Sequence, residues 1–165
     1  MGENSTENLS ITLRETEVND LDALFTFQSD EEAGYMAAFV NENWQNKDAY
    51  LAKWKRLLAD ETIKIRTIVV DNKVVGSVLI WQLMGEPQIS YGVGKEFWNK
   101  GIVTSALQQF LSIFPDRPLY GRAASDNVAS IKIMTKCGFK KINEEQSYAH
   151  ARQKEITEVV FVLED

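Results

Sequence analysis

The chain has 165 residues, of which 44% are hydrophobic and 25% charged, a composition typical of a globular domain rather than of a disordered chain. Its 24 acidic and 18 basic residues give a formal net charge of −6, which disfavours a general attraction to nucleic acid phosphates. Cys137 and His150 are the only cysteine and histidine, so an internal disulfide and most zinc sites are excluded. We therefore expect no metal and no nucleic acid partner.

The first nine residues form a predicted flexible tail, because Leu9 is their only apolar anchor and little burial offsets the entropy of ordering them. Residues 10–165 are predicted to form a single domain. No apolar segment follows a basic start, and no apolar run approaches the ~20 residues that span a bilayer. These features predict a cytoplasmic protein without a membrane partner.

The first third of the domain is predicted to form one strand followed by helices. A strand is predicted over 11–14 and a helix from residue 21, whose apolar positions recur at helical spacing. Helical spacing continues weakly between Asp30 and Lys47, where Gly34 opposes it. Asp48 is predicted to cap a further helix, whose buried stripe is Leu51, Trp54, Leu57 and Leu58.

A hairpin comes next. Residues 62–70 and 74–81 are rich in β-branched side chains, and Asp71-Asn72-Lys73 between them is typical of a turn. Gly85-Glu86-Pro87 is predicted to interrupt the chain before another strand over 88–93.

The last half alternates between helices and strands. A helix is predicted over 101–114, ended by Pro115, and a strand over 119–124. Asp126-Asn127 is predicted to cap a short helix that Gly138 closes, and two strands over 139–148 and 155–163 finish the chain. Since the strand-helix-strand unit over 88–124 requires a parallel pair, the fold class is α/β with a mixed, mostly antiparallel sheet.

The segment that joins residues 88–93 to the following helix predicts an anion site. Gly92, Gly94 and Gly101 bracket a helix start, where the first four backbone N–H groups have no partner within the helix. Lys95 and Lys100 add positive charge. The segment does not match a dinucleotide fingerprint, whose sixth position is here Phe97, nor a nucleotide-binding loop, in which Ser or Thr follows the lysine.

These residues resemble the GNAT superfamily of acyl-CoA-dependent N-acyltransferases, and within it the branch that acetylates the N-termini of ribosomal proteins. Residues 90–104, SYGVGKEFWNKGIVT, are similar to the strand and pyrophosphate loop of that branch. Residues 127–139, NVASIKIMTKCGF, are similar to its second coenzyme A motif. The resemblance implies a GNAT-like sheet in which the two parallel strands splay apart, leaving a notch for the pantetheine arm of acetyl-CoA.

The resemblance also implies which residues contact acetyl-CoA. Trp98 and Val103 stand at the first and last positions of the loop pattern, where the superfamily at large has Gln or Arg and Gly or Ala. The implied contacts are Gly92, Val93, Trp98, Asn99, Lys100, Gly101, Ile102, Val103, Thr104, Asn127 and Ser130.

Catalytic roles follow from the same resemblance. Many family members carry a tyrosine that protonates the departing thiolate, but Met134 occupies that position here, and Ser130 is the implied substitute. Tyr91 and Glu86 are candidates for the remaining acid–base work, and Glu31, Glu32 and Glu42 stand in the region that covers the acceptor in relatives.

The leading interpretation is thus an N-acetyltransferase that transfers acetyl from acetyl-CoA to a primary amine, on a protein N-terminus or a small molecule, by direct attack in a ternary complex. The alternative is a coenzyme A-binding sensor or interaction module without turnover, suggested by Val103, Met134 and the absence of an evident base. Monomer and homodimer both stay open.

Overall fold

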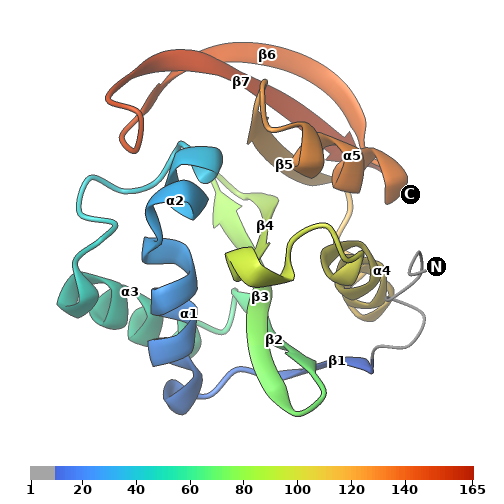
Figure 1. Ribbon diagram of the computed structural model, residues 1–165. Helices are drawn as coiled ribbons and strands as arrows, with labels where there is room; N and C mark the ends of the chain where they lie inside the picture. Colours follow the sequence, from blue (N-terminus) through green and yellow to red (C-terminus); the bar gives the residue numbers. More distant parts are fainter. Residues whose placement is uncertain (1–9) are drawn as a thin grey trace.

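The computed structural model describes residues 10–165, so the predicted tail over 1–9 lies outside the described residues. A seven-stranded sheet has the order β1-β2-β3-β4-β5-β7-β6 (Figure 1). Its strands are β1 (Ile11–Glu15), β2 (Lys64–Val70), β3 (Lys73–Leu83), β4 (Glu86–Val93), β5 (Leu119–Ala124), β6 (Lys140–Ala149) and β7 (Lys154–Leu163). Only β4 and β5 pair in parallel, which confirms the predicted mixed, mostly antiparallel sheet.

Helices cover both faces of the sheet (Figure 1). They are α1 (Leu21–Ser29), α2 (Glu31–Ala37), α3 (Lys47–Ala59), α4 (Ile102–Ile113) and α5 (Val128–Lys136), with short 3-10 turns η2 (Val18–Asp20) and η3 (Lys95–Phe97). Leu79 of β3 packs with α1 and α3, whereas its neighbours Val78 and Ile80 pack with α4. The alternation follows from the two-residue period of a strand.

The segment between α1 and α3 differs from its prediction. The helical spacing over 30–47 yields only α2, because the chain turns at Ala38, and Gly34 of α2 lies against the Trp44 ring. A Cβ atom on Gly34 would lie 2.1 Å from Trp44 ring carbons, so only glycine fits there. The cap of α3 is also corrected: the side chain of Asn46, not Asp48, accepts from the Ala49 N–H, because the helix begins at Lys47.

The predicted interruption at Gly85-Glu86-Pro87 is present but shorter than expected, because only Gly85 of the three lies in the turn. Glu86 and Pro87 already belong to β4 and pair with Leu83 and Gln82 of β3. Met84 and Gly85 form the two-residue turn, with φ of 52° and 82°. Two positive φ angles match the twist of a tight hairpin, and Gly85 adopts its angle without strain.

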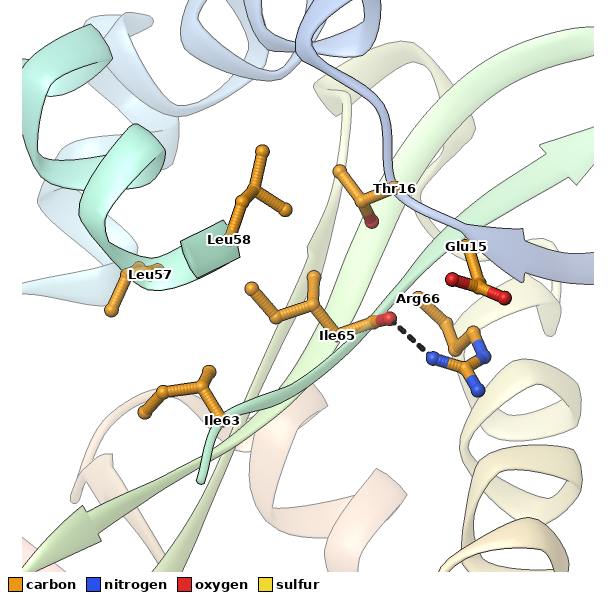
Figure 2. Close-up of a pocket in the computed structure, with 7 residues that line it drawn as sticks. All are labelled: Glu15, Thr16, Leu57, Leu58, Ile63, Ile65 and Arg66. Carbon is orange, nitrogen blue, oxygen red and sulfur yellow. Dashed lines mark hydrogen bonds between the residues drawn. The ribbon is translucent and has the colours of Figure 1, made fainter. Parts of the chain in front are cut away.

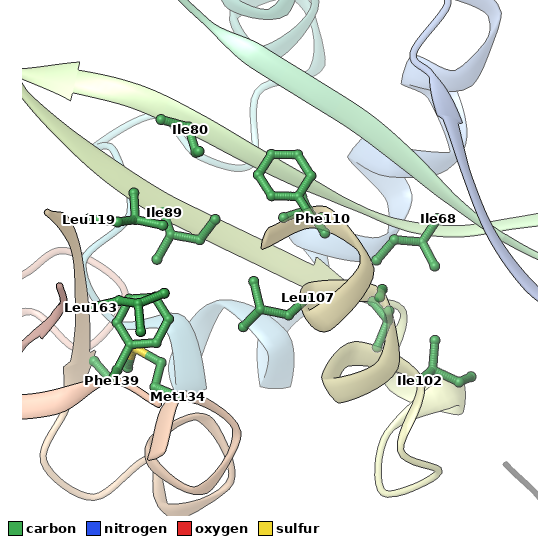
Figure 3. Close-up of a cluster of buried hydrophobic side chains, with 14 of the residues drawn as sticks. Ile68, Ile80, Ile89, Ile102, Leu107, Phe110, Leu119, Met134, Phe139 and Leu163 are labelled. Atoms are coloured by element: carbon green, nitrogen blue, oxygen red, sulfur yellow. The ribbon is translucent and has the colours of Figure 1, made fainter. Parts of the chain in front are cut away.

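The largest core cluster lies between the sheet and the pair α4 and α5. Figure 3 shows Leu107 and Phe110 of α4 facing Ile89 and Leu119, with Met134 of α5 beside Phe139. A Cβ atom on Gly121 would lie 2.6 Å from the Met134 sulfur, so a bare backbone on β5 makes room for that side chain. Met134 is fixed in the core, which agrees with its lacking an acid–base role.

Candidate functional site

The two parallel strands separate almost as soon as they meet. A single residue pair, Gln88 with Tyr120, joins β4 to β5. Beyond that pair, residues 89–93 and 121–124 diverge, and we call this region the β4–β5 divergence. Gly92 lies in it, exposed, with open space where a Cβ would be. The register leaves backbone groups of two central strands available to a ligand, as the resemblance implied for the pantetheine arm.

A loop over 94–101 that includes η3 joins β4 to α4, and the N-terminus of α4 has no side-chain cap. Gly101 precedes it with φ of 76°, and Asn99 is left-handed as well, with φ of 63°. The Trp98 indole N–H donates to the Val93 carbonyl at 3.2 Å, which holds the loop against the end of β4. A helix of 12 residues with uncapped N–H groups and a partial positive charge is suited to a pyrophosphate.

Lys95 of this loop forms two ion pairs with acidic side chains. Lys95 lies 3.3 Å from Asp30 and 3.6 Å from Glu32, at the start of α2. The hydrogen bond to Asp30 raises the pKa of Lys95, which stays charged but faces carboxylates. Its predicted contribution to the anion site is therefore corrected: Lys95 joins the loop to α2. Lys100 is exposed beside Gly101.

Asn127 and Ser130 lie at the N-terminus of α5. The Asn127 side-chain oxygen Oδ1 accepts from the Ser130 N–H at 3.2 Å, which confirms the predicted cap. Its amide nitrogen donates to the Met36 carbonyl at the end of α2, also at 3.2 Å. Asn127 thus connects α5 to α2, a contact that no local pattern indicated.

Tyr91 and Ser130 meet across the β4–β5 divergence. The two hydroxyl oxygens are 2.7 Å apart, so one donates to the other. Burial raises the pKa of Tyr91 to about 12, although the Ser130 hydrogen bond opposes the shift. The tyrosine therefore keeps its proton at neutral pH and is a donor rather than a base. The structure thus brings together Tyr91 and Ser130, two of the three residues for which a catalytic role was predicted.

The sequence model described as "Acetyltransferase (GNAT) domain" matches residues 10–140 of the chain. The chain belongs to the GNAT acetyltransferase family. An uncharacterized N-acetyltransferase p20 of Bacillus licheniformis is 27% identical, covering 93% of this chain and 92% of that protein. The enzyme is thus an acetyltransferase, and acetyl-CoA is its co-substrate.

Solved structures share the fold of this acetyltransferase. A ribosomal-protein-alanine N-acetyltransferase from Brucella melitensis superposes with a TM-score of 0.79 at 16% identity, covering 93% of this chain and 99% of that one. The microcin C7 self immunity acetyltransferase MccE, in complex with acetyl-CoA and AMP, has a TM-score of 0.76 at 19% identity, with coverage of 94% and 92%. These matches confirm the GNAT-like fold.

The acidic candidates of the acetyltransferase lie apart from the Tyr91–Ser130 pair. Glu86 is exposed at the β3–β4 turn, five residues before Tyr91 along the strand. At about 3.3 Å per residue, their Cα atoms are separated by roughly 16 Å. Glu31, Glu32 and Glu42 are exposed, with Glu32 near Lys95. The structure thus does not bring Glu86 to the divergence.

A polar network on the sheet face that α2 covers was not predicted from the sequence. Glu158 of β7 is 8% exposed, and its carboxylate accepts from Ser147 at 2.9 Å and from Arg122 at 3.3 Å. Arg122 also donates to Glu145 at 2.9 Å. The available signal was Glu158 next to the apolar run over 159–163, since a carboxylate beside such a run is rarely buried unless it is paired.

Two hollows in the surface of the acetyltransferase lie elsewhere. Figure 2 shows one between the end of β1, β2 and α3, where Arg66 donates to the Ile65 carbonyl. The other lies between α5 and the β6–β7 pair, beside Phe139 and Phe161. Neither is lined by Tyr91, Gly92 or Ser130. The candidate site therefore rests on the strand divergence rather than on either hollow.

No helix among residues 10–165 is long and apolar enough to cross a membrane. Within the same residues, histidine, cysteine and carboxylate side chains form no group suited to a metal ion.

Proposed function

We propose that this acetyltransferase acetylates a primary amine, on a protein N-terminus or a small molecule, by direct attack on acetyl-CoA in a ternary complex. The observation that carries the proposal is the Tyr91–Ser130 hydrogen bond across the β4–β5 divergence, next to an uncapped helix N-terminus. One feature supplies a proton donor and the other a place for the pyrophosphate, and the transfer needs both.

The proposed step breaks one bond and forms one. The amine nitrogen attacks the thioester carbonyl carbon, a C–N bond forms, and the C–S bond breaks. The thiolate takes the Ser130 proton, Tyr91 restores it through their hydrogen bond, and the proton lost by the amine returns to Tyr91 through solvent. Backbone N–H groups near Gly92 and Val93 polarise the carbonyl oxygen as it becomes negative.

The missing base bears on the choice of amine. Glu86 lies away from Tyr91 and Ser130, and Glu158 is already engaged with Arg122 and Ser147. An N-terminal amine has a pKa of ~7.7–8.0 and is partly neutral without help, whereas a lysine amine near ~10.4 is not. A protein N-terminus is therefore the preferred acceptor, and we place the enzyme with the branch that acts on ribosomal proteins.

Structural neighbours define a useful test panel. They include a ribosomal-protein-alanine N-acetyltransferase, a spermidine N-acetyltransferase and a putative phosphinothricin N-acetyltransferase. Acetyl-CoA mixed with Ala-initiated peptides, spermidine and phosphinothricin is followed for thiol release, and products are identified by mass spectrometry. We expect acetylated peptide at a rate well above background hydrolysis. Coenzyme A binding without any acetylated product would favour the sensor interpretation, which Met134 and Val103 suggested.

A further inference from the structure

Three carbonyl groups at the C-terminal end of α2 are bound by donors from elsewhere in the chain. The Tyr35 carbonyl accepts from Arg152 Nε at 2.9 Å, the Met36 carbonyl from Asn127 at 3.2 Å, and the Ala38 carbonyl from the Ala151 N–H at 3.3 Å. The last carbonyls of a helix have no partner within it, so α2 is capped by the start of α5 and by the β6–β7 turn.

Arg152 makes the most contacts in this arrangement. Its guanidinium donates to both Asp126 carboxylate oxygens, at 2.7 and 2.9 Å, and lies 4.2 Å from the centre of the Tyr35 ring. The side chain is 3% exposed although it stands in a turn. The Asp126 hydrogen bond raises the pKa of Arg152 and lowers that of Asp126, so both stay charged. One side chain thus joins α2, the residue before the α5 cap, and the β6–β7 turn.

The α2 backbone beside Arg152 is strained. Ala38 has φ of 65° and ψ of −59°, and the Phe39 N–H donates to the Ala37 carbonyl at 2.7 Å. This is a γ-turn with positive φ, a conformation that a residue with a Cβ adopts only when its surroundings impose it. Ala38 is fully buried against Ala124 and Ala149. The tertiary contacts, rather than local preference, therefore hold the end of α2 in place.

The end of α2 lies on the face from which an acceptor reaches the divergence. Ala123 of β5 faces the core beneath α4 and α5, whereas Ala124 faces Ala38. Ile89, Tyr91 and Val93 of β4 also pack on the α4 side, which leaves Ser90 and Gly92 exposed on the α2 side. Because the core fills the α4–α5 face, the amine approaches from the α2 face. Helix α2 contacts β5 and lies below the β6–β7 turn in Figure 1.

We infer that Arg152 is a positioning residue that holds the last turn of α2 against the N-terminus of α5 and thereby shapes the acceptor side of the transfer site. The inference rests on the proposed function for the site's location. It assigns Arg152 no contact with the reacting atoms. Its removal therefore affects acceptor use and the backbone of α2, and leaves acetyl-CoA binding at α4 unchanged.

The test compares Arg152→Met with Arg14→Met. Arg14 makes the same two-bond pair with Asp20, at 2.9 and 2.8 Å, near β1 and away from the divergence. For Arg152→Met we expect acceptor kcat/KM to fall about tenfold or more, mainly through KM, with acetyl-CoA Kd unchanged. Amide exchange at residues 36–39 rises by a similar factor. Arg14→Met loses thermal stability but changes neither quantity.

A second variant, Arg152→Lys, keeps the test decisive if Arg152→Met does not fold. Arg152→Lys keeps the charge and loses the two-bond geometry, so we expect an intermediate rise in acceptor KM and in exchange at 36–39. The inference is overturned if Arg152→Met, or Arg152→Lys where Met does not fold, leaves exchange at 36–39 at the wild-type rate. If the wild type acetylates no amine, the proposed function has failed, and the exchange measurement still decides whether Arg152 holds α2.

Discussion

The N-termini of α4 and α5 both border the β4–β5 divergence, yet they are built in opposite ways. Helix α4 begins at a left-handed glycine without a side-chain cap, whereas α5 begins at Asn127, whose side chain accepts from the Ser130 N–H. An uncapped start leaves backbone donors for an anion, while a capped start uses them internally and fixes the residues that follow. The first terminus is suited to binding the coenzyme and the second to placing one hydroxyl.

The largest predicted effect removes the hydroxyl that the α5 cap positions. Ser130→Ala lowers kcat by about ten- to a hundredfold, equivalent to ~1.4–2.7 kcal/mol, because the thiolate loses its proton donor. Acetyl-CoA Kd, measured by calorimetry, stays unchanged. Ser112→Ala is the control, since the exposed Ser112 hydroxyl donates to the Gln109 carbonyl within its own helix α4. An unaltered kcat in Ser130→Ala removes Ser130 from the mechanism.

The next prediction changes the left-handed glycine that precedes the uncapped start of α4. Gly101→Ala puts a Cβ on a residue whose φ is 76°. A residue with a Cβ is less stable in this left-handed conformation by ~1–2 kcal/mol. We expect acetyl-CoA Kd to rise about five- to thirtyfold, because the loop no longer rests in its binding conformation. Gly85→Ala has a similar φ of 82° in the β3–β4 turn and is the matched control. Equal Kd values for the two variants would contradict the role given to α4.

A third prediction separates capping from catalysis. Asn127→Ala and Asn46→Ala each remove a side-chain cap, from α5 and α3, and each lowers the free energy of unfolding by ~1 kcal/mol in denaturant titrations. Only Asn127→Ala lowers kcat, because only that cap fixes Ser130. A kcat loss of the same size in Asn46→Ala would show that stability alone explains the effect.

The raised pKa of Tyr91 predicts that the free energy of unfolding depends on pH. Its pKa is raised to about 12 by burial, above the ~10 of an exposed tyrosine, so the folded state holds the proton more tightly. This contribution is fully present below pH ~10 and is lost as the pH rises towards the folded value. Between pH ~10 and about 12, the melting temperature of Tyr91→Phe falls less steeply with rising pH than that of the wild type. Parallel slopes would contradict the burial of the Tyr91 hydroxyl.

The smallest effect concerns Lys95. Because its ammonium faces Asp30 and Glu32 at the start of α2, Lys95→Met changes acetyl-CoA Kd less than about twofold at ordinary salt. Calorimetry on that variant beside Gly101→Ala gives the comparison. A larger rise in acetyl-CoA Kd for Lys95→Met would show that this lysine contributes to the anion site.

Features governed by near neighbours were predictable. The α5 cap, the two-residue period of β2 and β3, and the apolar stripe of α4 depend on spacings of two to four residues, which are visible in any sequence. The family resemblance then placed Ser130 and Tyr91 at one site, and the structure brings their hydroxyls together. Where local preference was weak, as at Gly34, or two caps competed, as at Asn46 and Asp48, the prediction was wrong.

The sequence by itself determined the order of elements, the loop that precedes α4 and the identity of the residues at α5. Tertiary structure decided which distant groups meet: Tyr91 with Ser130 over 39 residues, and Arg152 with Asp126 over 26. Such pairs depend on how strands align in the sheet and on how helices and turns pack beside it, and neither is encoded in a short window. That is why the uncapped start of α4 was visible from its glycines, while the anchoring of α2 by Arg152 was not.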